Sequence, residues 1–218
     1  MALLARLAAN PHVKWETEIE TAAIDRCVGW AMYMGGGVYG GDENRLPFRI
    51  LLNGEPAKIR ARLERIVHHR ATVPSTSGLV GLDLSETGVT DLGPLSALTD
   101  LDVLQLNESA VVDLRPLAGL ANLRELDVTQ TRVTDITPVA GLKKLRLLWL
   151  LKTGVSDVRP LAGLTELKDL SLGETKVTDL GPLAGLTKLE RLDLQGTPVT
   201  EDDVKLLQAR LPKLRINR

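Results

Sequence analysis

The chain has 218 residues, of which 44% are hydrophobic and 25% are charged, and its formal net charge at pH 7 is −1. This length allows one ordinary domain, or a small domain joined to a repeat array, and either can bury a core. No apolar run approaches the ~18 residues that a membrane-spanning helix needs, and the chain lacks the basic excess expected of a nucleic-acid-binding protein.

The N-terminal segment, residues 1–55, shows no clear resemblance to a known family. It begins "MALLARLAAN", which has too short an apolar stretch and no preceding basic region for a classical secretory signal. The expected location is therefore cytoplasmic, with non-classical secretion left open. The alternation in "HVKWETEIE" and the apolar run "LPFRILL" (46–52) predict two strands, and "TAAIDRCVGWAMYM" (21–34) between them is apolar enough for a buried helix. We expect a small α/β segment of unknown role.

Two features of this segment could carry chemistry. The glycine-rich "GGGVYGG" (35–41) lacks the Lys-Ser/Thr of a phosphate-binding loop, so we interpret it as a mobile loop. Cys27, Asp25 and either His68 or His69 have the residue types of a thiol nucleophile, an orienting carboxylate and a base, but nothing in the sequence brings them together. A lone cysteine in an apolar stretch is more often a core residue. We therefore assign no catalytic residue, no metal and no cofactor.

Residues 56–78 predict a helical N-terminal cap and linker. Pro56 opens "PAKIRARLERIVHHR", in which Ile59, Leu63 and Ile66 share one side and basic residues the other. The terminal units of a repeat array need such a cap.

A 22-residue repeat organises the chain from residue 79 onward. Its pattern is LxxLxLxx(T/S)xVxDLxPLxGLxx, and apolar residues recur at places 1, 4, 6, 11, 14, 17 and 20 of each unit. Seven inward positions per unit suit a coil with one continuous interior stack. The leading leucines, each 22 residues after the last, are Leu79, Leu101, Leu123, Leu145, Leu167, Leu189 and Leu211.

This array is identified as a leucine-rich repeat and resembles the bacterial internalin type, as in "VTDLGPLAGLTKLERLDL" (177–194). The resemblance covers residues 79–216. It implies an α/β leucine-rich-repeat solenoid, with a parallel concave β-sheet, short 3₁₀ turns on the convex side and helical caps. It does not imply a particular partner, because this fold hosts many.

Two polar rows recur in the units and favour structural roles. One, whose hydroxyls can bond the backbone at a turn, consists of Thr87, Ser109, Thr131, Thr153, Thr175 and Thr197. The other, whose carboxylates suit turn N–H groups better than a metal, consists of Asp91, Asp113, Asp135, Asp157 and Asp179. A functional site would not be copied into every unit.

The repeats proper span residues 79–200, and the pattern then changes. Thr200 and Asp203 have capping-box spacing, and Val204, Leu207 and Leu211 fall on one helical face. Residues 201–218 thus predict a helical C-terminal cap, followed by a short strand from Leu211 to Ile216.

One unit differs from its neighbours on the predicted concave face. Alternation places residues 3, 5 and 7 of each unit on that face, and the fourth unit carries Leu147, Trp149 and Leu151 there. Neighbouring units offer polar or charged residues at these places. The predicted binding residues are Trp149, Leu147, Leu151, Val103, Gln105, Glu125, Asp127, Asp169, Ser171 and Asp193.

Exposed aromatic residues with apolar neighbours carry disproportionate binding energy, so this patch predicts a protein-binding hot spot in an acidic rim. The alternative is that Trp149 lies flat over adjacent coils and only shields them. The leading hypothesis is a non-catalytic protein-interaction module whose partner offers an apolar anchor beside Lys or Arg, with no role for nucleic acid or membrane. A bacterial effector that recognises host proteins is the second hypothesis, and an enzyme in residues 1–55 is the third.

Overall fold

The computed structural model describes residues 48–51 and 79–218. The strand expected over 46–52 is present there as β1, Phe48–Leu51. The other expectations for residues 1–78, including the helical cap and the Cys27 cluster, lie outside the described residues.

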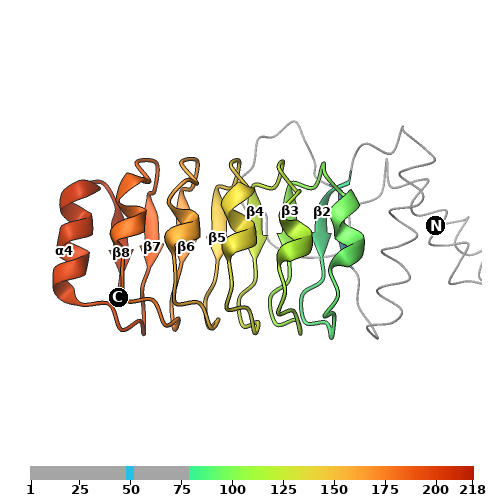
Figure 1. The fold of residues 1–218 in the computed structure, drawn as a ribbon, viewed down its shortest axis with the longest axis horizontal. Helices are drawn as coiled ribbons and strands as arrows, with labels where there is room; N and C mark the ends of the chain where they lie inside the picture. The colour runs from blue at the N-terminus through green and yellow to red at the C-terminus, as the bar shows by residue number, and fades with distance from the viewer. Residues whose placement is uncertain (1–47, 52–78) are drawn as a thin grey trace, which may run out of the picture. The chain divides into compact units, whose positions relative to one another are not determined.

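The sheet has its strands in chain order from β1 to β8, and the repeats supply β2 to β8, which Figure 1 labels. Strands β2 to β8 pair in parallel, and the register places Leu104, Leu126 and Leu148 side by side, as the 22-residue period requires. The strands are β2 (Leu79–Asp83), β3 (Val103–Gln105), β4 (Glu125–Asp127), β5 (Leu147–Trp149), β6 (Asp169–Ser171), β7 (Arg191–Asp193) and β8 (Arg215–Asn217).

Short 3₁₀ helices lie opposite the sheet, one in each unit from the first to the fifth, as the resemblance implies. Each has a proline at its first or second position, where a fixed φ suits a helical start and no N–H is lost from the ladder. They are η2 (Gly93–Ala97), η3 (Arg115–Leu117), η4 (Thr137–Gly141), η5 (Arg159–Leu161) and η6 (Gly181–Gly185).

The core is one stack of apolar side chains between the sheet and the 3₁₀ helices. In the fourth unit all seven predicted inward positions are at most 2% exposed. These are Leu145, Leu148, Leu150, Val155, Val158, Leu161 and Leu164. The inward assignment of the repeat is therefore confirmed.

Side chains of both polar rows form hydrogen bonds with backbone groups. The hydroxyl of Thr153 donates to the carbonyl of Leu150 at 2.7 Å, and the other four threonines of the row do the same in their own units. Ser109 differs, because its buried hydroxyl has no hydrogen-bond partner among the described residues. Each aspartate of the second row accepts the backbone N–H two residues later, at the start of a 3₁₀ helix; in the fourth unit Asp157 accepts from Arg159 at 2.9 Å.

The last unit departs from the 22-residue period. Helix α4, Glu201–Arg210, begins with the expected capping box between Thr200 and Asp203 and buries Val204 and Leu207. The predicted final strand is present, but it begins at Arg215 and not at Leu211, so only the predicted start was wrong. An α-helix uses more chain than a 3₁₀ turn, and the register between the last two strands consequently advances by 24 residues, from Leu192 to Ile216.

Strands β2 to β7 each lead into a left-handed turn at place 8 of the unit. Non-glycine residues hold φ between 52° and 58° there, and their N–H groups reach the neighbouring coil, as Glu86 N–H does to the Asn107 carbonyl at 2.8 Å. The row consists of Glu86, Glu108, Gln130, Lys152 and Glu174, with Gly196 at φ 71° in the sixth unit.

Candidate functional site

The outward face of the sheet is built as the alternation predicts. In β5 the side chain of Leu148 is fully buried, whereas Leu147 and Trp149 on either side of it are half-buried and face outward. Leu151, at the strand exit, is also half-buried. We call these three residues the apolar patch. Half-burial means that each keeps some accessible surface while it rests on neighbouring side chains.

The register fixes the neighbours of the apolar patch. Trp149 pairs with Asp127 on one side and Ser171 on the other, and Leu147 pairs with Glu125 and Asp169. These pairings are the ones the sequence predicts. Val103 and Gln105 lie one strand further away, since Glu125 stands between Val103 and Leu147. The apolar patch is thus confined to one coil, and Val103 is not continuous with it in the sheet.

A glycine in the next coil makes room for the patch. A Cβ atom added to Gly173 would lie 2.8 Å from Cδ1 of Leu151 and 2.9 Å from Oδ2 of Asp193. The side chain of Leu151 therefore lies against Gly173 of the fifth coil, where a larger residue would collide with it. Sequence reasoning missed this contact, although a glycine beside the only apolar residue in the place-7 column was a readable signal.

The predicted acidic rim is partly neutralised. Arg191 in the sixth coil forms an ion pair with Asp169, donating through Nε and, at 2.6 Å, from Nη2 to Oδ2. Asp193 accepts hydrogen bonds from the hydroxyl of Ser171 at 3.1 Å and from Nδ2 of Asn217 at 2.8 Å. The sequence places all of these residues on the outward face but does not reveal that they bond across coils. The carboxylate of Asp169 is therefore less available to a partner than predicted.

Aspartates at place 5 also have a local role that sequence reasoning missed. Asp127 accepts the N–H of Thr129 at 2.8 Å, and Asp83 accepts the N–H of Ser85 at 3.0 Å. Burial raises the pKa of Asp127 above its ordinary value, a shift that the bond from Thr129 opposes and the negative charge of Asp83 reinforces. Asp127 is thus a partly desolvated carboxylate directly beside Trp149.

Among the described residues, no cluster of three or more His, Cys, Asp or Glu could hold a metal ion. Over the same part of the chain, no helix is long and apolar enough to cross a membrane. The outward face presents an apolar patch, a desolvated carboxylate and a paired arginine.

Comparisons with known proteins agree with this architecture. The chain matches no protein-family model and no curated protein. An internalin (inlF) from Listeria monocytogenes superposes with a TM-score of 0.61 at 34% identity, over 65% of this chain and 41% of that chain. Internalin C2 (inlC2) from the same species gives a TM-score of 0.60 at 38% identity, over 65% of this chain and 61% of that chain.

The match therefore spans less than two thirds of either internalin structure. A plant peptide hormone receptor, RGFR1 in complex with RGF2, superposes with a TM-score of 0.55 at 18% identity, over 65% of this chain and 24% of that chain. At that identity the likeness concerns the fold alone.

Proposed function

We propose that this chain, which belongs to the leucine-rich repeat proteins and carries repeats like those of internalins, is a non-catalytic module that binds a protein partner on the concave face of its sheet. The observation that carries the proposal is the apolar patch. The adjacent coils carry polar side chains at the same places, except for Gly173 beside Leu151, and the patch keeps accessible surface in the middle of the array. A half-exposed tryptophan between two leucines is a typical anchor for a partner.

The electrostatics beside the patch favour a partner that presents Lys or Arg next to its apolar anchor. Desolvation makes the charged form of Asp127 costly, as its raised pKa shows. A cation placed over this carboxylate on binding would remove part of that cost. Asp83 and Asp193 extend the same preference along the place-5 column, whereas Asp169 is already paired with Arg191.

The fold supports the class of function and not the partner. Leucine-rich repeats present a broad sheet face on a rigid scaffold, and the plant receptor with this fold is bound to RGF2.

The test begins with affinity capture, in which wild type is compared with Trp149→Asp by mass spectrometry. For a partner lost with that variant, Trp149→Ala is expected to weaken binding by at least about 2 kcal/mol, mainly through faster dissociation, because a central anchor is truncated. Binding kinetics and titration calorimetry measure this effect.

Val112→Ala is the matched control, because Val112 is also a large apolar residue, 53% exposed, and lies off the strands. It is expected to leave the affinity unchanged. A dissociation rate that Trp149→Ala does not alter would contradict the proposal.

A further inference from the structure

A row of charged side chains runs along the edge of the solenoid where the chain enters the strands. The row occupies place 2 of successive units and consists of Asp102, Arg124, Arg146, Lys168 and Glu190. Its two ends are neutralised in pairs, because Arg124 Nη1 lies 3.4 Å from Asp102 Oδ2 and Lys168 Nζ lies 3.4 Å from Glu190 Oε1. Arg146 stands between the two pairs.

Arg146 is exposed and makes no ion pair within the part of the chain that the structure describes. The nearby carboxylate of Glu166 is already bonded to Lys188 at 2.6 Å, and this bond lowers the pKa of Glu166. Arg146 also attracts Glu166 and helps to lower its pKa, but the two form no ion pair, because Lys188 bonds that carboxylate.

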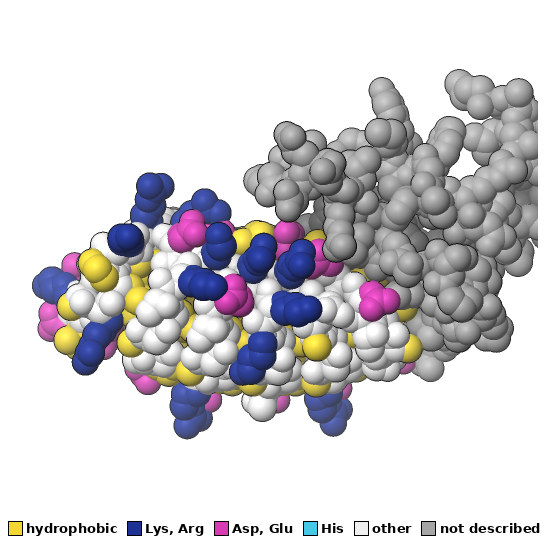
Figure 2. Space-filling view, turned by 90° about the horizontal axis from the view of Figure 1, so that it is seen from above, with side chains coloured by type: hydrophobic (Ala, Val, Ile, Leu, Met, Phe, Trp, Pro, Cys, Tyr) yellow, Lys and Arg dark blue, Asp and Glu magenta, His cyan; other side chains and the backbone are white. Residues whose placement is uncertain are grey.

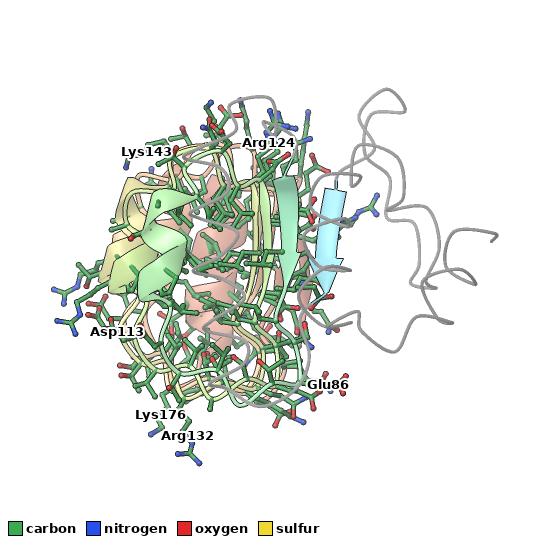
Figure 3. The ribbon with its side chains drawn as sticks, turned by 90° about the vertical axis from the view of Figure 1, so that its right-hand side faces the viewer. Glu86, Asp113, Arg124, Arg132, Lys143 and Lys176 are labelled. Carbon is green, nitrogen blue, oxygen red and sulfur yellow. The ribbon has the colours of Figure 1, made fainter. Side chains whose placement is uncertain are left out.

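Two further cations, at the end of the third unit, precede Arg146 in the chain, and among the described residues each is bonded to a neutral acceptor only. Lys144 Nζ donates to Asn122 Oδ1 at 2.7 Å, and Lys143 Nζ lies 3.4 Å from the carbonyl oxygen of Gly163. Figure 2 shows Lys and Arg side chains gathered on this face, and Figure 3 places Lys143 and Arg124 on the same edge. We call Lys143, Lys144 and Arg146 the basic edge.

The basic edge adjoins the apolar patch in the chain, since Lys143 and Lys144 end the third unit and Arg146 directly precedes Leu147 in the fourth. We propose that the basic edge binds a short acidic segment of the partner whose apolar anchor occupies the concave face; this inference rests on the proposed function. A partner that follows the chain from the end of the third unit into β5 would meet three cations and then the apolar patch. The edge would thereby fix the direction in which the partner lies, as charged rims do.

The ion pairs on either side of the basic edge limit how many acidic residues the edge can hold. Asp102 and Glu190 stand two coils away on either side of Arg146, which is about 10 Å at the usual strand spacing. Both carboxylates are already paired with Arg124 and Lys168, so a longer polyanion such as nucleic acid would extend over these ion pairs and gain no further unpaired cation there. Two or three Asp or Glu residues are therefore enough to contact the three cations of the basic edge.

The test uses the full-length chain and dye-labelled hexaglutamate, with hexaglutamine as the neutral probe and fluorescence anisotropy at low ionic strength as the readout. We expect saturable binding of hexaglutamate only, and an affinity at least about tenfold lower in Lys143→Glu/Arg146→Glu, because each substitution reverses a charge at the site. Arg132→Glu/Lys176→Glu is the matched control with the same change in net charge. Both control residues are exposed, make no ion pair among the described residues and lie on the opposite edge (Figure 3).

Equal losses in the two double variants would overturn the proposal, because they would show attraction to overall charge and not to a site. Absence of saturable hexaglutamate binding to the wild type would overturn it too. A third contrary outcome is an oligothymidylate that binds more tightly than hexaglutamate and is lost with Lys143→Glu/Arg146→Glu, since the occupant would then be a nucleic acid. Hexaglutamate has no apolar side chain for the concave face. A negative result with hexaglutamate therefore does not affect the Trp149 test of the proposed function. A negative result in the Trp149 test likewise does not affect the hexaglutamate measurement.

Discussion

The inward and outward residues of strand β5 differ in whether they recur in the other repeat units. Its inward residue, Leu148, is the same leucine that β3, β4, β6 and β7 carry, and it is fully buried in every one of them or nearly so. Its outward residues, Leu147 and Trp149, have no counterpart of the same type in either adjacent coil. Sequence repetition therefore specifies the scaffold, and departure from repetition marks the surface that distinguishes this chain. Substitutions on the two sides should separate stability from binding.

The largest expected effect is on the inward side. Leu148→Ala should lower the free energy of unfolding by about 2–5 kcal/mol, because it leaves a cavity in a stack where each coil rests only on its neighbours. The matched outward change, Leu147→Ala, should cost no more than about 1 kcal/mol. Urea denaturation measures both values. If the two variants lost equal stability, the distinction between inward and outward residues would fail.

A smaller effect separates two members of the buried hydroxyl row. Thr153→Val removes the bond to the Leu150 carbonyl and should cost about 0.5–1.5 kcal/mol. Ser109→Ala removes a buried hydroxyl that has no partner among the described residues, so it should be neutral or stabilising. Thermal and urea unfolding of both variants provide the comparison. A larger loss for Ser109→Ala would show that its hydroxyl has an undetected partner.

The smallest effect concerns two aspartates that each accept an N–H two residues later. Asp127 on the sheet face has a raised pKa because it is buried, and Asp157 on the 3₁₀ side has a lowered pKa because Arg159 bonds its carboxylate. Since the folded state holds the proton of Asp127 more tightly, this group destabilises the fold as pH rises from the unfolded pKa of about 3.9 through the folded value. Asp157 stabilises the fold above about pH 3.9 and loses that contribution as pH falls through its folded pKa.

Asn can still accept the local N–H at both positions, so the charge alone is removed. Asp127→Asn should therefore be as stable as wild type or more stable at pH 7, and Asp157→Asn should be less stable. Both differences should shrink as the pH is lowered below 4, which urea unfolding at a series of pH values can follow. Shifts of the same sign in the two variants would contradict the assigned causes.

The sequence predicts this fold well because each coil repeats the same local rules. Inward leucines, a proline at each 3₁₀ helix and a row of turn aspartates are all visible at a fixed period, and the alternation within "LRLLWLL" places Trp149 outward without ambiguity. The site is less predictable because its details depend on side chains 22 residues apart. The pairing of Asp169 with Arg191 and the contact of Leu151 with Gly173 depend on side-chain conformations, which the residue types at aligned repeat positions do not specify.

The same limit explains the error in the last coil. The spacing from Leu189 to Leu211 continues the 22-residue sequence pattern, but between these two residues an α-helix, α4, replaces the 3₁₀ turn. Leu211 ends that helix and does not begin a strand. Periodicity in sequence is informative only while the secondary structure that produces it stays the same.

The left-handed turn at place 8 offers a position for protein engineering. A non-glycine residue in this conformation costs about 1–2 kcal/mol, while glycine loses about 0.5–1 kcal/mol more conformational entropy on folding, so the two choices nearly balance. Natural use of Glu, Gln, Lys and Gly in the row agrees with this balance. What holds the turn is the backbone N–H bond to the next coil, which no side chain supplies. Labels, cross-linkers or immobilisation tags could therefore be introduced at the five non-glycine positions of this row, one per coil at a regular spacing, without disturbing the core or the concave face.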